Sequence, residues 1–192
     1  MCGICGTSNY GSRAPADEGT VREMTAAMIH RGPDDDGFYV DAEVALGMRR
    51  LSIIDLEGGA QPIGNEERTV WVISNGEIYN FRELRRELAA CGHTFATRSD
   101  TEVIVHAYEQ WGLDAFARLN GMFATAVWDA EKRRLVLARD PFGIKPLYYW
   151  DDGEQLVFGS ELRSIFCHPG VPRRVDVRAR ARSERSRPRI RP

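Results

Sequence analysis

The sequence predicts an α+β fold in which antiparallel sheets are layered against helices. Runs of strand-forming residues and runs of helix-forming residues follow one another without the regular strand–helix alternation typical of parallel sheets. Of the 192 residues, 43% are hydrophobic and 28% are charged, which is the composition of an ordinary globular domain. These observations exclude a wholly disordered or collagen-like chain and favour one sizeable domain.

Hydrophobic periodicity predicts the elements of the first half of the chain. A helix is expected over about 17–30, because Val21, Met24 and Met28 recur at helical spacing. Short apolar runs predict three strands, of which the last two lead into polar clusters, over residues 2–7, 44–48 and 70–73.

Two helices and then four strands are expected in the second half. Asn80 is expected to cap a helix that ends at Gly92. Ser99–Glu102 has the pattern of a capping box, so the next helix should begin there and run to Gly112. After Asn120 the apolar period changes, and four short strands are expected over residues 123–128, 135–139, 147–150 and 156–159.

Composition also limits the compartment. No run of about 18 or more uncharged apolar residues occurs, so we expect no membrane-spanning helix. Residues 1–6 contain neither a basic leader nor a long apolar stretch, so we expect no secretory signal. Four cysteines in a chain of this length do not form a disulfide framework. We therefore expect a cytoplasmic protein without a membrane partner.

The net charge of −2 hides an asymmetry near the C-terminus. Residues 173–192 contain nine arginines against Asp176 and Glu184, a net charge of +7, whereas residues 1–172 carry −9. The apolar pattern also stops there, so this segment cannot bury enough surface to offset its ordering entropy. We expect a folded domain over residues 2–172 and a disordered, Arg-rich tail over 173–192.

Cys2 is a candidate nucleophile that would carry its own base. After removal of Met1, a thiol and a free α-amine would share one residue. A thiol needs a base to form the reactive thiolate, and an α-amine with a pKa of about 7.7–8.0 is the only unperturbed amine near neutrality. From position alone, a small residue in a strand is the more frequent explanation of Cys2. Cys2 and Cys5 form one C-x-x-C without a second pair, so a zinc site is not expected.

Three polar clusters supply the other groups that such a nucleophile needs. The Arg50 guanidinium suits a carboxylate. Asn75 and Gly76 offer a side-chain amide and an uncrowded backbone N–H for a developing oxyanion, and Glu77 adds a carboxylate. Asp100 could cap a helix or pair with an ammonium group. Each is usually structural when alone, but together they match an amino acid whose side-chain amide is attacked.

A series of ordered motifs carries a family resemblance over about residues 2–170. The motifs are Cys2–Gly6, His30–Asp34, Arg50–Asp55, Asn75–Asn80, Ser99–Glu102, Gly121–Ala124, Arg139–Tyr149 and Gly159–Glu161. In these stretches the chain resembles the N-terminal glutaminase domain of glutamine-hydrolysing asparagine synthetases, which are class II glutamine amidotransferases. The resemblance implies a four-layer αββα N-terminal-nucleophile hydrolase fold with two antiparallel sheets.

The resemblance also implies roles for individual residues in hydrolysis of L-glutamine to glutamate and ammonia through a glutamyl thioester. Cys2 matches the nucleophile, and Asn75 and Gly76 match the oxyanion hole. The substrate-binding residues implied are Arg50 for the α-carboxylate, the backbone of Leu51, Ser52, Ile53 and Ile54 along the pocket wall, and Glu77 and Asp100 for the α-ammonium group.

The family's second domain has no counterpart in the sequence. That domain activates aspartate with ATP through a Ser-Gly-Gly-x-Asp-Ser loop, and neither this loop nor a G-x-x-x-x-G-K-[S/T] motif occurs here. We therefore expect no cofactor or metal on this chain, with ATP and Mg²⁺ on the missing synthetase domain. The Arg-rich tail favours a truncated or frame-shifted gene product, with a separate synthetase chain as a candidate partner.

Two other functions remain open on the sequence. The chain could be a catalytically silent remnant or a partner-binding module of a truncated synthetase. The arginines of 173–192 could also bind nucleic acid, but that segment has no aromatic residue for stacking and the rest of the chain is acidic. A nucleic-acid partner is therefore not expected.

Overall fold

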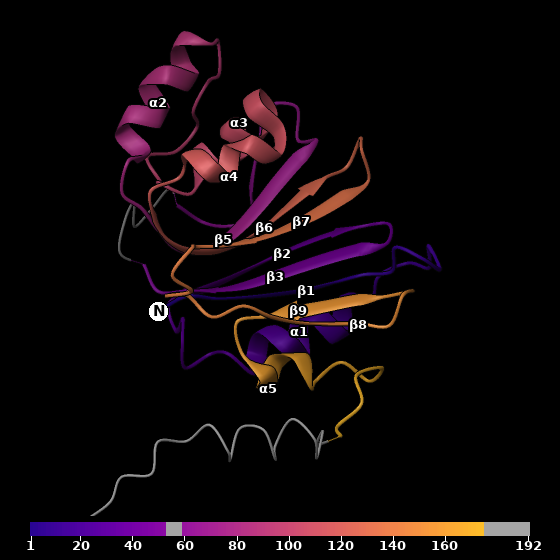
Figure 1. The fold of residues 1–192 in the computed structure, drawn as a ribbon. Coiled ribbons are helices and arrows are strands. Elements are labelled where there is room, and N and C mark those ends of the chain that lie inside the picture. Colours follow the sequence, from indigo (N-terminus) through magenta and orange to yellow (C-terminus); the bar gives the residue numbers. More distant parts are fainter. Residues whose placement is uncertain (53–58, 175–192) are drawn as a thin grey trace, which may run out of the picture.

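Two antiparallel sheets form the centre of the molecule. In the computed structural model, which describes residues 1–52 and 59–174, they are stacked face to face with helices outside them (Figure 1). The first sheet contains β1 (Gly3–Ser8), β2 (Asp35–Asp41), β3 (Val44–Arg50), β8 (Tyr148–Asp151) and β9 (Leu156–Gly159), in the order β2-β3-β1-β9-β8. The second contains β4 (Ile63–Gly64), β5 (Val70–Ile78), β6 (Gly121–Asp129) and β7 (Arg134–Arg139), in the order β4-β5-β6-β7.

Helices cover the outer face of each sheet. The helices α1 (Glu18–Ala26) and α5 (Leu162–Ile165) lie on the first sheet, and α2 (Phe81–Ala90), α3 (Glu102–Trp111) and α4 (Ala115–Arg118) lie on the second (Figure 1). A short 3₁₀ turn, η1 (Gly112–Asp114), joins α3 to α4. The predicted α+β class and its αββα layering are confirmed.

Three apolar clusters hold the four layers together. Ile4, Leu46 and Phe158 from the first sheet meet Ile73 and Ala126 from the second, all of them essentially inaccessible to solvent. A second cluster fills the space between α2, α3 and the second sheet, and a third packs α1 and α5 on the first sheet. Burial of apolar surface stabilises the folded chain by about 25 cal/mol per Å². The cluster between the sheets therefore holds them in a fixed position relative to each other.

Strand pairing brings distant motifs to one end of the sandwich. β1 pairs antiparallel with β3, and Gly3 stands opposite Arg49. Cys2, just before β1, therefore lies beside Arg50, the last residue of β3. β5 runs in the other sheet and carries Asn75, and the N-terminus lies at the end of the sandwich where the two sheets meet (Figure 1).

Two predicted helix caps are wrong, because tertiary contacts take the capping side chains. Asn80 makes no side-chain cap bond to α2, since its Oδ1 accepts from Asn120 N (2.9 Å) and its Nδ2 donates to Arg118 O (3.0 Å). The capping box at α3 does not form either. Glu102 instead accepts from the backbone N–H groups that precede the helix, of Ala96 (2.7 Å) and Thr97 (2.8 Å).

Several boundaries and elements also differ from expectation. β5 continues through Asn75, Gly76 and Glu77, which were expected to follow it, because β6 pairs with it along its whole length. α1 ends at Ala26, four residues before the predicted end of that helix. The strands β2 and β4 and the short helices α4 and α5 were not predicted. Residues 175–192, most of the predicted tail, lie outside the described residues, as do Ile53 and Ile54.

Among the described residues, no helix combines the length and the apolar character needed to cross a bilayer.

Candidate active site

The sulfur of Cys2 faces the backbone of the residue that follows Arg50. Leu51 N donates to Cys2 Sγ (3.4 Å), and Cys2 Sγ donates to Leu51 O (3.6 Å). The carbonyl of Cys2 is held as well, because it accepts from Arg31 Nε (2.8 Å), and Arg31 Nη1 forms an ion pair with Glu161 (3.1 Å). The candidate nucleophile is therefore fixed at both its carbonyl and its side chain.

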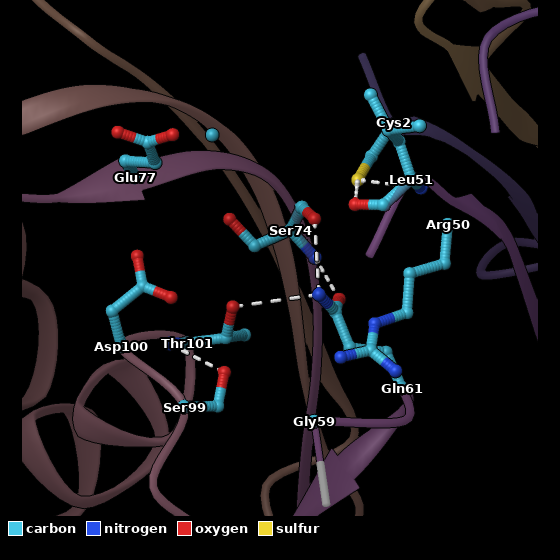
Figure 2. A pocket seen from close by; sticks show the side chains of 11 residues that line it. Cys2, Arg50, Leu51, Gly59, Gln61, Ser74, Glu77, Ser99, Asp100 and Thr101 are labelled. Carbon is cyan, nitrogen blue, oxygen red and sulfur yellow. Dashed lines mark hydrogen bonds between the residues drawn. The ribbon is translucent and has the colours of Figure 1, made fainter. Parts of the chain in front are cut away.

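Cys2 lies at one wall of a pocket between the two sheets and the start of α3 (Figure 2). Six residues singled out from the sequence line it, namely Cys2, Arg50, Leu51, Gly76, Glu77 and Asp100. Five that sequence reasoning did not select also line it, namely Gly59, Gln61, Ser74, Ser99 and Thr101. Ser52 and Asn75, which were also singled out from the sequence, are not among its lining residues. The backbone N–H of Ser52 donates to Asp34 (2.8 Å).

Asn75 presents a buried side-chain amide without a partner. Its neighbour Ile73 belongs to the core between the sheets, so Asn75, two residues further along the strand, faces the sheet that carries Cys2. Asn75 is 0% exposed, and among the described residues neither its Oδ1 nor its Nδ2 has a hydrogen-bond partner. An unpaired buried polar group costs about 1–3 kcal/mol, so its retention calls for a ligand or a mechanistic role.

Gly76 is required by the close approach of β5 to β6. A Cβ at this position would collide with the carbonyl oxygen of Met122 and lie 2.6 Å from Phe123 Cα. With no side chain there, the backbone of Gly76 borders the pocket directly. Asn75 and Gly76 thus place an amide side chain and a backbone N–H in succession at the strand that faces Cys2.

Two carboxylates lie on the side of the pocket opposite Arg50 (Figure 2). Asp100 is 5% exposed, and its Oδ2 accepts from Ile78 N (2.8 Å). Burial raises the pKa of Asp100 and the nearby Glu77 charge raises it further, although the Ile78 N–H opposes the change. A guanidinium at one side and two carboxylates at the other match the two charged groups of a zwitterionic amino acid.

Gln61 supports the strand that carries Asn75. Its Oε1 accepts from Ser74 N (2.6 Å), and its Nε2 donates to Ser74 O (3.2 Å) and to Thr101 Oγ1 (3.4 Å). One side chain thereby satisfies both backbone groups of Ser74 and ties them to the start of α3 (Figure 2). Gln61 has no periodic or charge signal in the sequence, which is why sequence reasoning missed it.

Comparison with known proteins gives a consistent result. A family model described as "Glutamine amidotransferase domain" matches residues 1–186. Among curated proteins, the chain is 48% identical over 167 residues to asparagine synthetase [glutamine-hydrolyzing] 1 of Bacillus subtilis, and 42% identical over 178 residues to asparagine synthetase [glutamine-hydrolyzing] 3 of the same organism. The matches cover 86% and 92% of this chain but only 26% and 29% of those proteins.

Solved structures match at the level of the fold. The glutamine phosphoribosylpyrophosphate amidotransferase of B. subtilis superposes with a TM-score of 0.70 at 20% identity, and a structure described as the allosteric regulatory enzyme of purine biosynthesis with 0.71 at 22%. Each match covers 86% of this chain and 43% of the other.

Proposed function

The chain belongs to the glutamine amidotransferase domain family, and from this premise we propose that it hydrolyses L-glutamine to glutamate and ammonia with Cys2 as nucleophile. The observation that carries the proposal is the pocket itself. It joins Cys2, a guanidinium and two carboxylates, and borders the strand of Asn75, whose buried amide has no hydrogen-bond partner in the described part of the chain. Glutamine offers one charged group for each side of this pocket and a neutral carboxamide for the sulfur.

The substrate is held by its α-carbon groups. Arg50 binds the α-carboxylate, and the backbone of Leu51, next to the Cys2 sulfur, lines the path of the side chain. Glu77 and Asp100 bind the α-ammonium group. Ser52 lies outside the pocket lining, and its backbone N–H is bound by Asp34.

The chemistry proceeds in two steps. With Met1 removed, the α-amine of Cys2 takes the thiol proton, and the thiolate attacks the amide carbon. The C–N bond then breaks, the proton goes to the leaving nitrogen, and ammonia departs from a glutamyl thioester. Water adds to the thioester, the C–S bond breaks, and the sulfur regains a proton as glutamate leaves.

The oxyanion of both tetrahedral intermediates is bound by Asn75 and Gly76. Asn75 Nδ2 and the Gly76 N–H are donors fixed before the reaction starts, so they need no reorganisation as charge develops. The absence of a protein partner for Asn75 in the described residues leaves its amide available for this task.

The ammonia would serve a synthetase reaction. We place this domain in an asparagine-forming system, because the relatives are glutamine-hydrolysing asparagine synthetases and the chain spans about a quarter of their length. ATP and Mg²⁺ would act on a synthetase unit of the same or another polypeptide. Four free cysteines agree with a reducing, cytoplasmic compartment.

The test is direct assay of the purified chain. Glutamate and ammonia should appear in equal amounts from glutamine, and Cys2→Ala should release neither. An intact mass that matches loss of Met1 should accompany the activity. A folded, processed chain that binds glutamine but releases no ammonia would instead support the silent partner-binding module.

Arg50→Leu should weaken glutamine binding more than turnover. Loss of a charge-assisted hydrogen bond costs about 1.5–3 kcal/mol, so KM should rise by about 10- to 100-fold while kcat changes little. Steady-state kinetics separate kcat from KM. Arg50→Lys keeps the charge without the guanidinium fork, so its KM should lie between those of the parent and Arg50→Leu. A collapse of kcat at unchanged KM would contradict this role.

Glutamine binding should fail at acidic pH through Asp100. Because its pKa is raised in the folded protein, the carboxylate accepts a proton at a higher pH than an ordinary aspartate would. The attraction for the ammonium group is then full above this pKa and is lost as the pH falls through it. The acid limb of kcat/KM should report this midpoint, and Asp100→Asn should raise KM at neutral pH and shift the limb. An identical acid limb in the variant would remove Asp100 from the binding step.

A further inference from the structure

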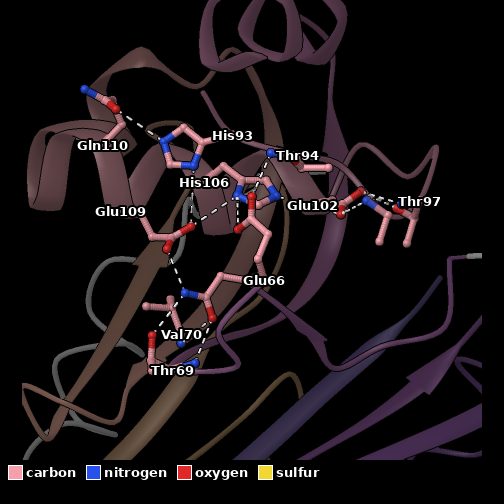
Figure 3. A network of polar contacts seen from close by, with 12 residues as sticks. Glu66, Thr69, Val70, His93, Thr94, Thr97, Glu102, His106, Glu109 and Gln110 are labelled. Atoms are coloured by element: carbon pink, nitrogen blue, oxygen red, sulfur yellow. Dashed lines mark hydrogen bonds and ion pairs between the residues drawn. The ribbon is translucent and has the colours of Figure 1, made fainter. Parts of the chain in front are cut away.

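A second polar cluster lies further along α3 from the pocket. Four side chains from three segments meet there, namely Glu66 in the β4–β5 turn, His93 after α2, and His106 and Glu109 on α3 (Figure 3). One ligand atom from each lies within 4.8 Å of the others. None of these residues belongs to the pocket that contains Cys2.

Three distances between donor atoms are close to those of a tetrahedral metal site. His106 Nδ1 lies 3.1 Å from Glu109 Oε2 and 3.6 Å from Glu66 Oε2, and His93 Nδ1 lies 3.7 Å from Glu109 Oε2. Around Zn²⁺, ligand bonds of about 2.0–2.2 Å place neighbouring donor atoms roughly 3.3–3.5 Å apart. The four donor atoms lie within 4.8 Å of one another, and rotation of the exposed Glu66 and Glu109 side chains would bring the wider pairs toward that spacing.

Both glutamates are oriented through their other oxygen. Glu66 Oε1 accepts from Thr94 N (2.7 Å), and Glu109 Oε1 accepts from Asn65 Nδ2 (2.7 Å). The second oxygen of each carboxylate thereby faces the histidines. An ion pair that forms by chance on a protein surface does not require a second hydrogen bond that orients its carboxylate.

The two histidines differ in how the nitrogen that points away from the cluster is held. His93 Nε2 is paired with Gln110 Oε1 (3.2 Å), so this nitrogen carries the proton and Nδ1 keeps its lone pair toward the cluster. His106 is 1% exposed, and its Nε2 has no hydrogen-bond partner among the described residues but faces Glu102 Oε1 at 3.8 Å. Carboxylate or carbonyl groups behind ligating histidines are the usual outer layer of zinc sites.

From this arrangement we propose that Glu66, His93, His106 and Glu109 bind a divalent transition metal ion, with Zn²⁺ as the best match. Two imidazoles and two carboxylates suit zinc better than Mg²⁺ or Ca²⁺, which prefer oxygen ligands alone. The surrounding charge agrees with a cation, because three carboxylates, those of Glu66, Glu102 and Glu109, lie within 4 Å of the His106 ring nitrogens.

The metal would act as a structural link. It would join the turn before β5, the loop after α2 and the middle of α3 (Figure 3). The second sheet and the helices that cover it would thereby be linked to each other. Thr101, the residue just before α3, lines the pocket, and His106 lies about 7.5 Å further along the helix axis at 1.5 Å per residue. The proposal is independent of glutamine hydrolysis, because the pocket's own residues take no part.

The experiment uses the tag-free full chain, stripped with a chelator and titrated with Zn²⁺ alone by calorimetry. One ion should bind per chain and should raise Tm. Co²⁺ at the same site should give the strong visible absorption of tetrahedral coordination. Cys2→Ala should leave both signals in place, which separates this site from a metal held by the pocket's thiol.

Variants of the exposed ligands complete the test. His93→Gln and Glu109→Gln should lower Zn²⁺ affinity by at least about 100-fold and abolish the Tm increase, and the orienting change Gln110→Ala should lower affinity by about 10-fold. His30→Gln, which removes a histidine–glutamate pair elsewhere, should bind as the parent does. Failure of the parent chain to bind Zn²⁺, or equal binding by parent, His93→Gln and Glu109→Gln, would overturn the proposal.

Discussion

A chain that retains any residue ahead of Cys2 is expected to bind glutamine but to lose its hydrolysis. In such a chain the nitrogen of Cys2 is an amide, which cannot take the thiol proton. General-base assistance contributes about 10²–10⁴-fold, so kcat should fall by that factor while glutamine affinity is kept. The measurement compares ammonia release with glutamine binding, and intact mass establishes the N-terminal residue of each preparation.

A removable extension provides the matched control. A leader that a site-specific protease cuts directly before Cys2 should give an inactive chain that becomes active on cleavage. Cys2→Ala with the same leader should stay inactive before and after. Full turnover by the uncut chain would refute the role of the α-amine, because no free amine would then be present on Cys2.

Asn75→Ala is expected to lower kcat by about 10²–10³-fold with little change in KM. The loss follows from removal of one oxyanion donor, which acts on the transition state rather than on bound substrate. The same change should lower Tm only slightly, because among the described residues neither polar atom of Asn75 has a partner whose bond could be lost. Kinetics and thermal unfolding measured on one preparation test both parts.

Asn65→Ala is the matched structural control. Asn65 is also buried, but it bonds to Thr69, to Val70 N and to Glu109, so its loss should lower Tm. It should leave kcat close to the parent value. If Asn75→Ala destabilised the chain and kept its turnover, Asn75 would be a structural residue only.

Local sequence patterns were sufficient for the layers but not for the element ends. The apolar runs around Ile4, Ile73 and Phe123 predict strands because each is a short continuous run that is largely buried on both faces of its sheet. The caps at Asn80 and Glu102 could not be predicted, since their partners depend on how loops and helices pack in three dimensions. Strand β2 was missed because its half-exposed, aspartate-rich sequence lacks an apolar face.

The candidate site likewise contains residues that could be predicted from the sequence and residues that could not. Cys2, Arg50 and Asp100 could be selected because each carries chemistry that is visible in one side chain. Gln61 could not, because its importance comes from pairing with the backbone of Ser74, thirteen residues away. The cluster of Glu66, His93, His106 and Glu109 could not be predicted either, because its members come from three separate segments of the chain.

Arg31 binds Cys2 through the carbonyl oxygen of Cys2 and not through the Cys2 amine. Met1 is 58% exposed and takes no part in this hydrogen bond, so removal of Met1 need not disturb β1. Folding can then precede processing, because the contact that positions Cys2 forms equally well with Met1 present or removed. The catalytic amine would be uncovered on an already folded chain, without any need for refolding.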